Sequence, residues 1–223
     1  TGRDKEMTEK TLNNNQVVVA GEIASEFVFS HEIFGEGFYM VDLVVSRLSD
    51  AYDVIPLMVS DRLFDVTTSH VGEKIMAKGQ FRSYNKHEET KNRLVLSVFA
   101  REVSFVEIPE GEQNPNHIFL DGYVCKPPIY RKTPLGREIA DILVAVNKPY
   151  GKSDFIPCIA WGRNARFCQN IEVGTKVKIT GRVQSRNYEK KFEDGTTQTR
   201  TAYEVSISSL EIVNEEEENK EVI

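Results

Sequence analysis

Apolar and polar residues alternate in short runs along most of this chain, and a period of two is typical of half-buried β-strands. The first half contains five such runs, at residues 17–23, 38–45, 54–59, 74–81 and 93–100, and residues 103–108 extend the last one. Between the third and fourth runs we expect a helical turn within residues 60–69. This order predicts a five-stranded Greek-key barrel, the OB-fold.

The same pattern occurs twice. A polar, turn-rich stretch at 109–115 ends the first set of runs, and a second set follows it. Gly122 corresponds to Gly21 at an offset of 101 residues, and Gly181 corresponds to Gly79 at an offset of 102. A register held over this distance indicates a tandem duplication.

We therefore predict an all-β chain of two tandem five-stranded OB-fold Greek-key barrels, each with a short helix between strands 3 and 4. The predicted parts are a first OB-fold at 14–108, a linker at 109–115, a second OB-fold at 116–213 and an acidic tail at 214–223. In the second barrel we expect the helix at 164–171, because the apolar residues at 165, 168 and 171 share one face.

Charge divides unevenly along the chain, although the whole has a net charge of −6. Residues 1–115 carry 12 Lys+Arg and 19 Asp+Glu, a net charge of −7. Residues 116–213 carry 15 Lys+Arg and 10 Asp+Glu, a net charge of +5. Residues 214–223 carry 1 Lys and 5 Glu, a net charge of −4. The second half is a basic module between two acidic segments, as expected if it binds an anionic partner.

The only tryptophan lies in the apolar run at 153–162. Strand alternation places Phe155, Ile159 and Trp161 on one face and small or aliphatic residues on the other. Large rings on the face opposite the core indicate a contact surface, and a small core under a loop is the alternative.

The second half resembles the bacterial single-stranded DNA-binding protein family over nearly all of residues 116–213. The matching positions follow the family's order of strands and turns. They are Asn116, Gly122, Pro128, Arg131, Thr133, Pro134, Gly136, Ile139, Ala140, residues 145–148, residues 154–162, Gly181, Arg182, Arg186, Tyr188, Arg200, Glu204 and Val205.

This resemblance implies sequence-tolerant binding and protection of single-stranded DNA in replication, recombination or repair. Bases would stack on aromatic rings and basic side chains would follow the phosphates. The implied stacking residues are Trp161, Phe155, Tyr188 and Tyr150. The phosphate-binding candidates interleaved with them are Arg131, Arg137, Lys148, Lys152, Arg163, Arg182, Arg186, Lys190, Lys191 and Arg200.

The first half is a degenerate copy at these positions. In the repeat register, Val54 stands in place of Phe155 and Ser60 in place of Trp161. Tyr84 partly replaces the Tyr188 region. With a net charge of −7, the first barrel is expected to contribute weakly to DNA binding and to supply a pairing surface.

The resemblance also implies partners. Family members commonly work with four barrels, so a chain of two barrels is expected to form a homodimer. The acidic residues of 214–223 either recruit replication or repair proteins or form a solubilising end.

The other function classes find little support. His31, His70, His87 and His117 lack metal-type spacing, the acids are scattered, and Cys125, Cys158 and Cys168 lack ligand spacing, so neither a cofactor nor an enzyme is expected. No apolar run is long enough to span a membrane, and a cytoplasmic, nucleoid-associated protein is expected. The open alternative is a duplicated OB-fold adaptor, primosomal-like or plasmid-borne, that binds mainly protein or RNA.

Overall fold

The computed structural model describes residues 13–88 and 91–218, and most of them lie in one continuous sheet of 12 strands. The first half contributes six strands, β1 (Asn15–Ile23), β2 (Val28–Ile33), β3 (Glu36–Ser46), β4 (Tyr52–Ser60), β5 (Lys74–Glu88) and β6 (Lys91–Phe105). The second contributes β7 (Asn116–Val124), β8 (Ile129–Lys132), β9 (Glu138–Asn147), β10 (Ser153–Trp161), β11 (Lys176–Lys191) and β12 (Thr197–Ile212). The short helical segments are η1 (Pro149–Gly151), α2 (Arg163–Cys168) and α3 (Glu215–Glu218).

Each half curls into a barrel. In the first, β1 pairs with both β5 and β3, and in the second β7 pairs with both β11 and β9. One parallel pairing completes each barrel, β4 with β6 and β10 with β12. The predicted all-β architecture of two OB-folds is confirmed.

Two details differ from the prediction. Each barrel has an extra strand, β2 or β8, which forms a hairpin with the strand that follows it. The predicted helix after the third OB strand is present in the second barrel as α2, but in the first barrel residues 61–64 form turns. The Asp65 carboxylate accepts hydrogen bonds from the backbone N–H and hydroxyl of Thr67, and such local bonds compete with helix formation.

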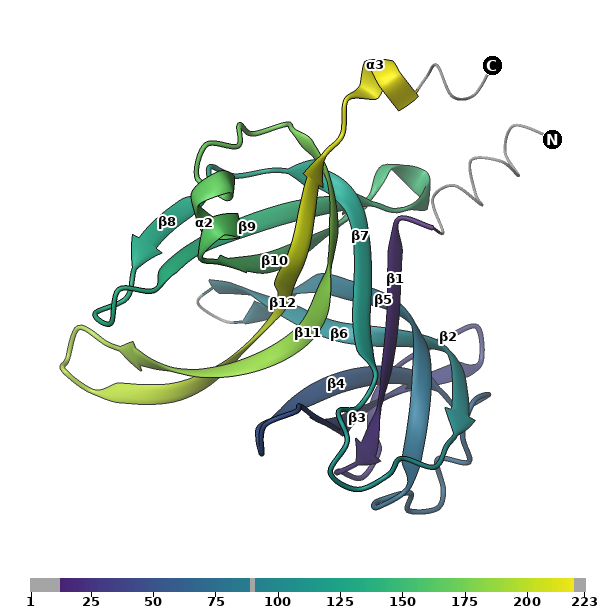
Figure 1. Ribbon diagram of the computed structural model, residues 1–223. Coiled ribbons are helices and arrows are strands. Elements are labelled where there is room, and N and C mark those ends of the chain that lie inside the picture. Colours follow the sequence, from purple (N-terminus) through teal and green to yellow (C-terminus); the bar gives the residue numbers. More distant parts are fainter. Residues whose placement is uncertain (1–12, 89–90, 219–223) are drawn as a thin grey trace.

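The two barrels are related by an approximate two-fold axis. β1 and β7 lie side by side and antiparallel (Figure 1), with Val17 opposite Ile118. Because the repeat offset here is 101 residues, Val17 and Ile118 are equivalent positions. The first strand of one repeat therefore pairs with the first strand of the other. The chain therefore contains an internal, self-complementary interface of the kind that usually joins two subunits.

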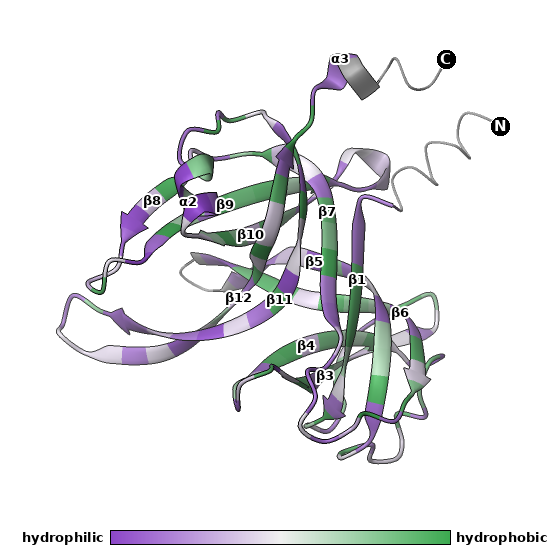
Figure 2. Cartoon of the chain, viewed as in Figure 1, coloured by the Kyte–Doolittle hydropathy of each residue, from purple (hydrophilic) through white to green (hydrophobic). Residues whose placement is uncertain are grey.

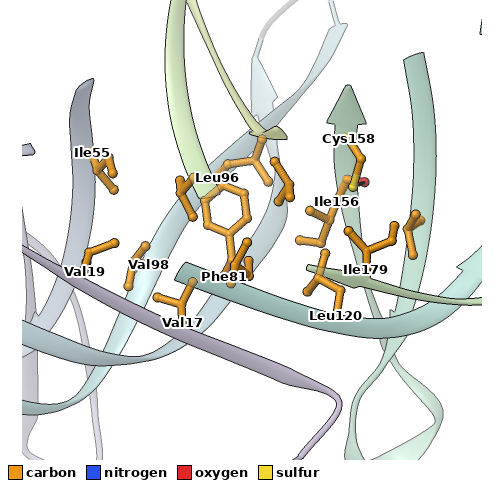
Figure 3. Packing of buried hydrophobic residues seen from close by; sticks show 14 of the residues in the cluster. Val17, Val19, Ile55, Phe81, Leu96, Val98, Leu120, Ile156, Cys158 and Ile179 are labelled. Atoms are coloured by element: carbon orange, nitrogen blue, oxygen red, sulfur yellow. Dashed lines mark hydrogen bonds between the residues drawn. The ribbon is translucent and has the colours of Figure 1, made fainter. Parts of the chain in front are cut away.

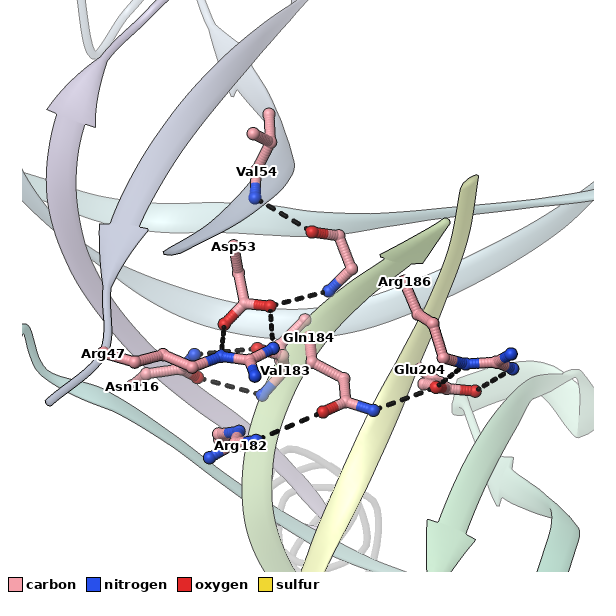
Figure 4. A network of polar contacts seen from close by, with 10 residues as sticks. Arg47, Asp53, Val54, Asn116, Arg182, Val183, Gln184, Arg186 and Glu204 are labelled. Carbon is pink, nitrogen blue, oxygen red and sulfur yellow. Dashed lines mark hydrogen bonds and ion pairs between the residues drawn. The ribbon is translucent and has the colours of Figure 1, made fainter. Parts of the chain in front are cut away.

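Buried polar groups repeat the same symmetry. The Asp53 carboxylate accepts from the backbone N–H of Ser185, whose hydroxyl accepts from the N–H of Val54 (Figure 4). In the other direction the Asp154 carboxylate accepts from the N–H of Ser83, whose hydroxyl accepts from the N–H of Phe155. Both carboxylates are almost fully buried, so these paired bonds fix how the barrels sit against each other.

The core extends across both barrels. Hydrophobic residues alternate with hydrophilic ones along the strands (Figure 2), and the inward-facing set forms one cluster. Val17 and Phe81 from the first barrel and Leu120, Ile156 and Ile179 from the second belong to that cluster (Figure 3). Among the described residues, no helix is long and apolar enough to cross a membrane.

Candidate nucleic-acid interface

β10 carries two of the predicted stacking rings, one at each end. Phe155 is 40% exposed near the start of the strand, and Trp161 is half-buried at its last position. Six residues of strand separate them by about 20 Å, so different bases would have to contact the two rings. Ile159, predicted on the same face, is buried, so the two rings do not form an unbroken apolar surface.

Trp161 is already in contact with a cation. The guanidinium of Arg137, which follows the β8–β9 turn, lies over the indole ring at 4.5 Å from its centroid. This cation–π contact orients the ring and brings a positive charge to a stacking position. Arg137, predicted as a phosphate contact, thus lies directly beside a predicted base contact.

Tyr188 lies on the long hairpin formed by β11 and β12, which extends beyond the barrel (Figure 1). Its ring is 39% exposed, and its cross-strand partner is Arg200. Lys190 and Arg200 both lie over the ring of Phe192, at 5.7 and 5.6 Å from its centroid. Phe192 was not among the predicted residues, although its place directly after two lysines was a usable signal.

Tyr150 lies in η1, the loop between β9 and β10. Its side chain is 99% exposed and its backbone has a φ of 68°, a left-handed conformation rare for a residue with a Cβ. The ring therefore extends from the loop into solvent, and Tyr150 lies between Lys148 and Lys152 in the sequence.

Several predicted phosphate contacts are paired with acids. Arg186 donates to Glu204 at 2.9 Å, and Arg131 and Lys148 lie 3.4 Å from Asp141 and Asp154. A phosphate would have to compete with these carboxylates, so each of these cations contributes less to binding than an unpaired one would. Of the remaining candidates, Lys152, Arg163 and Lys191 are exposed.

Arg182 is placed elsewhere, at the junction between the barrels. Its Nε is buried without a hydrogen-bond partner, and an η nitrogen donates to Gln184 at 3.3 Å (Figure 4). Burial lowers the pKa of Arg182, and the neighbouring Arg47 adds to this effect. The structure does not bring Arg182 together with the exposed rings.

The first barrel reaches the basic hairpin of the second. A cleft of 710 Å³ is bounded by Arg93 and Leu94 of β6 and by Arg200 and Tyr203 of β12. The β5–β6 and β11–β12 hairpins therefore meet around this opening, and a ligand on Arg200 would also meet the first barrel.

The described part of the acidic segment contacts the second barrel at Tyr123. The hydroxyl of Tyr123 donates to a Glu215 carboxylate oxygen at 3.1 Å, and burial followed by this carboxylate raises the pKa of Tyr123. Val222 and Ile223, the apolar end of the predicted tail, lie outside the described residues. Within the described ranges, no three His, Cys, Asp or Glu side chains are grouped to hold a metal ion.

Comparison with known proteins finds a family model that matches the second barrel. Residues 115–213 match the family model of the single-strand binding protein family. A single-stranded DNA-binding protein of Oceanobacillus iheyensis is 36% identical over 89 residues, which are 37% of this chain and 54% of that protein. Single-stranded DNA-binding protein A of Bacillus subtilis is 36% identical over 81 residues, 33% of this chain and 47% of that protein. The chain thus spans about half the length of these curated relatives.

A solved structure matches both barrels. The wild-type single-stranded DNA-binding protein from Thermus aquaticus has a TM-score of 0.71, with 90% of this chain and 93% of that chain covered. At 18% identity, this likeness establishes the fold.

Proposed function

From the match of residues 115–213 to the family model of the single-strand binding protein family, we propose that the chain binds single-stranded DNA with little regard to base sequence. The observation that carries the proposal is the set of accessible rings on the matched barrel, Phe155, Trp161 and Tyr188. Arg137 lies over the Trp161 ring, and Arg200 is the cross-strand partner of Tyr188. Every base has a π-face, so stacking on these rings tolerates any sequence.

The binding role needs no chemical step. The rings would hold bases, and the exposed Lys152, Arg163 and Lys191 would hold phosphates. The proposed role is to bind and protect single strands in replication, recombination or repair, and proteins of this family are non-enzymatic. We extend the proposal to a homodimer with four barrels, and to recruitment of replication or repair proteins by the acidic segment.

The test uses the single tryptophan. Titration with oligo-dT at several salt concentrations is expected to quench Trp161 fluorescence strongly, with affinity falling steeply as salt rises. The slope of log affinity against log salt reports the number of phosphates neutralised. If neither the fluorescence nor the anisotropy of a labelled oligonucleotide changes at low salt, the chain does not bind single strands. Equal or tighter binding of oligo-U would favour RNA instead.

A variant pair locates the contact. Tyr188→Ala removes a stacking ring and is expected to weaken oligo-dT binding by roughly 1–3 kcal/mol. The control, Phe167→Ala, removes a ring that is 51% exposed on α2 and lines a different cleft, and it should bind as the unmodified protein does. Equal losses in both variants would contradict the assignment of Tyr188.

A further inference from the structure

The first barrel carries its own ring-lined cleft, although its sequence lacks the stacking residues at the repeated positions. The cleft has a volume of 620 Å³. The side chains of Phe29, Tyr84 and Phe99 line it, together with those of Arg82, Lys86 and Lys148. No Asp or Glu belongs to the lining, so the −7 charge of the first half lies elsewhere.

Two of the three rings in this cleft are accessible from solvent. Phe29 is 57% exposed and Tyr84 is 46% exposed. Phe99 lies deeper, against Phe38 at 5.7 Å between ring centroids, and the guanidinium groups of Arg82 and Arg101 lie 5.0 and 4.8 Å from its centroid. Rings with cations beside them are the combination that holds stacked bases and their phosphates.

Arg82 lacks a full set of partners. Its Nε is buried with no hydrogen-bond partner, and its side chain is next to the like charge of Arg101. A buried donor without an acceptor costs free energy, and a phosphate oxygen in the cleft would supply one.

The cleft continues into the second barrel. Lys148, from the loop that follows β9, forms part of its wall, beside Ser83 of β5 in the first barrel. The Ser83 hydroxyl accepts from the backbone N–H of Phe155 at 2.7 Å, so the backbone of Phe155 borders the cleft.

We propose that this cleft is a second base-stacking site, which takes unpaired bases of the same DNA strand that contacts Phe155. The inference rests on the proposed function and extends it to the first barrel. The rings come from β2, β5 and β6, whereas the family-like rings of the second barrel lie on β10 and β11. The first barrel is therefore a binding domain with relocated contacts.

Reporter variants test the site directly. In a Trp161→Phe background, Tyr84→Trp places the only tryptophan in the cleft, and oligo-dT of about 30 nucleotides, enough for two barrels, should quench it. The control is Phe105→Trp in the same background. Phe105 is 61% exposed but packs near Phe64 and His70, far along β6 from the cleft, and its reporter should remain unchanged.

A loss-of-contact variant gives an independent readout. Phe29→Ala combined with Tyr84→Ala changes only exposed rings and keeps Trp161 as the probe. Affinity for the long oligonucleotide should fall about tenfold or more, with a shorter occluded length, because two stacking surfaces are lost.

The outcomes separate the two proposals. Quenching of Trp161 together with the Tyr84→Trp reporter supports both. A different result overturns the second site and leaves the proposed function standing. In that result Trp161 is quenched, the fluorescence of the Tyr84→Trp reporter does not change, and the double-alanine variant keeps its affinity. No response from either tryptophan, and no anisotropy change, removes the proposed function and the second site with it.

Discussion

A single histidine in the first barrel shows how residue-level geometry sets a pH response. His70 has one ring nitrogen 2.6 Å from a Glu73 carboxylate oxygen and the other 2.8 Å from the Asp65 carbonyl oxygen. Only the protonated ring donates to both acceptors, and the pKa of His70 is accordingly raised, first by Glu73 and then by the Asp65 carbonyl. The ring also packs edge-on against Phe27 and Phe64.

This geometry predicts how stability depends on pH. Because the folded-state pKa of His70 is raised above 6.5, its contribution is complete below that pH and is lost as pH rises through the raised value. The free energy of unfolding should fall by up to about 1 kcal/mol across this window. Urea denaturation at a series of pH values measures it. His70→Gln should flatten the profile, whereas Leu48→Ala, at a residue that is 80% exposed, should keep it. An unchanged profile in His70→Gln would refute the assignment.

At the scale of the element, bulges shape the long hairpins. The register of β5 against β6 shifts at Gly79, and that of β11 against β12 shifts at Gly181. A Cβ at these glycines would lie only 1.8 Å from the Phe99 carbonyl oxygen and 2.1 Å from the Ser206 carbonyl oxygen. The repeated glycines therefore allow two backbones to approach where each barrel bends.

The close approach predicts a stability loss on adding one methyl group. Gly181→Ala should destabilise the protein by about 1–3 kcal/mol, because the backbone of β12 must move away. Lys191→Ala, an exposed change on the same strand, serves as the control and should be nearly neutral. Chemical denaturation compares the two, and equal midpoints would show that the bulge accommodates a Cβ.

At the scale of the whole molecule, the barrels share a sheet and a core. β1 pairs with β7, the Asp53 and Asp154 carboxylates accept hydrogen bonds across the junction, and buried residues of both halves form one cluster. If either barrel opened at this junction, buried core residues of the other barrel would be exposed to solvent. We therefore expect the two barrels to unfold together.

A distant core substitution tests this coupling. Leu57→Ala, at a fully buried site in the first barrel, should destabilise by about 2–5 kcal/mol and lower the urea midpoint reported by Trp161 in the second. Leu48→Ala, at a residue that is 80% exposed, should leave that midpoint in place. A Trp161 transition that stays fixed while far-UV circular dichroism develops an earlier step would show independent barrels.

The sequence by itself determined the local structure and its repetition. Alternation of apolar and polar residues is a property of each strand alone, so the main strands and the duplication followed from it, whereas the extra strands β2 and β8 did not. The α2 region followed from the helical spacing of its apolar residues. The exposed rings at Phe155, Tyr150 and Tyr188 were also predictable, because their strand or loop context is local.

Only the tertiary structure decided which distant residues meet. Asp154 looked like one of several scattered acids, yet strand packing buries it opposite Ser83 and gives it Lys148 as a partner. Phe29 and Phe99 are 70 positions apart, and no local pattern places them in one cleft. The physical reason is that strand register and barrel closure are set by the whole hydrogen-bonded sheet, whereas a sequence pattern reports only which side of its own strand a residue faces.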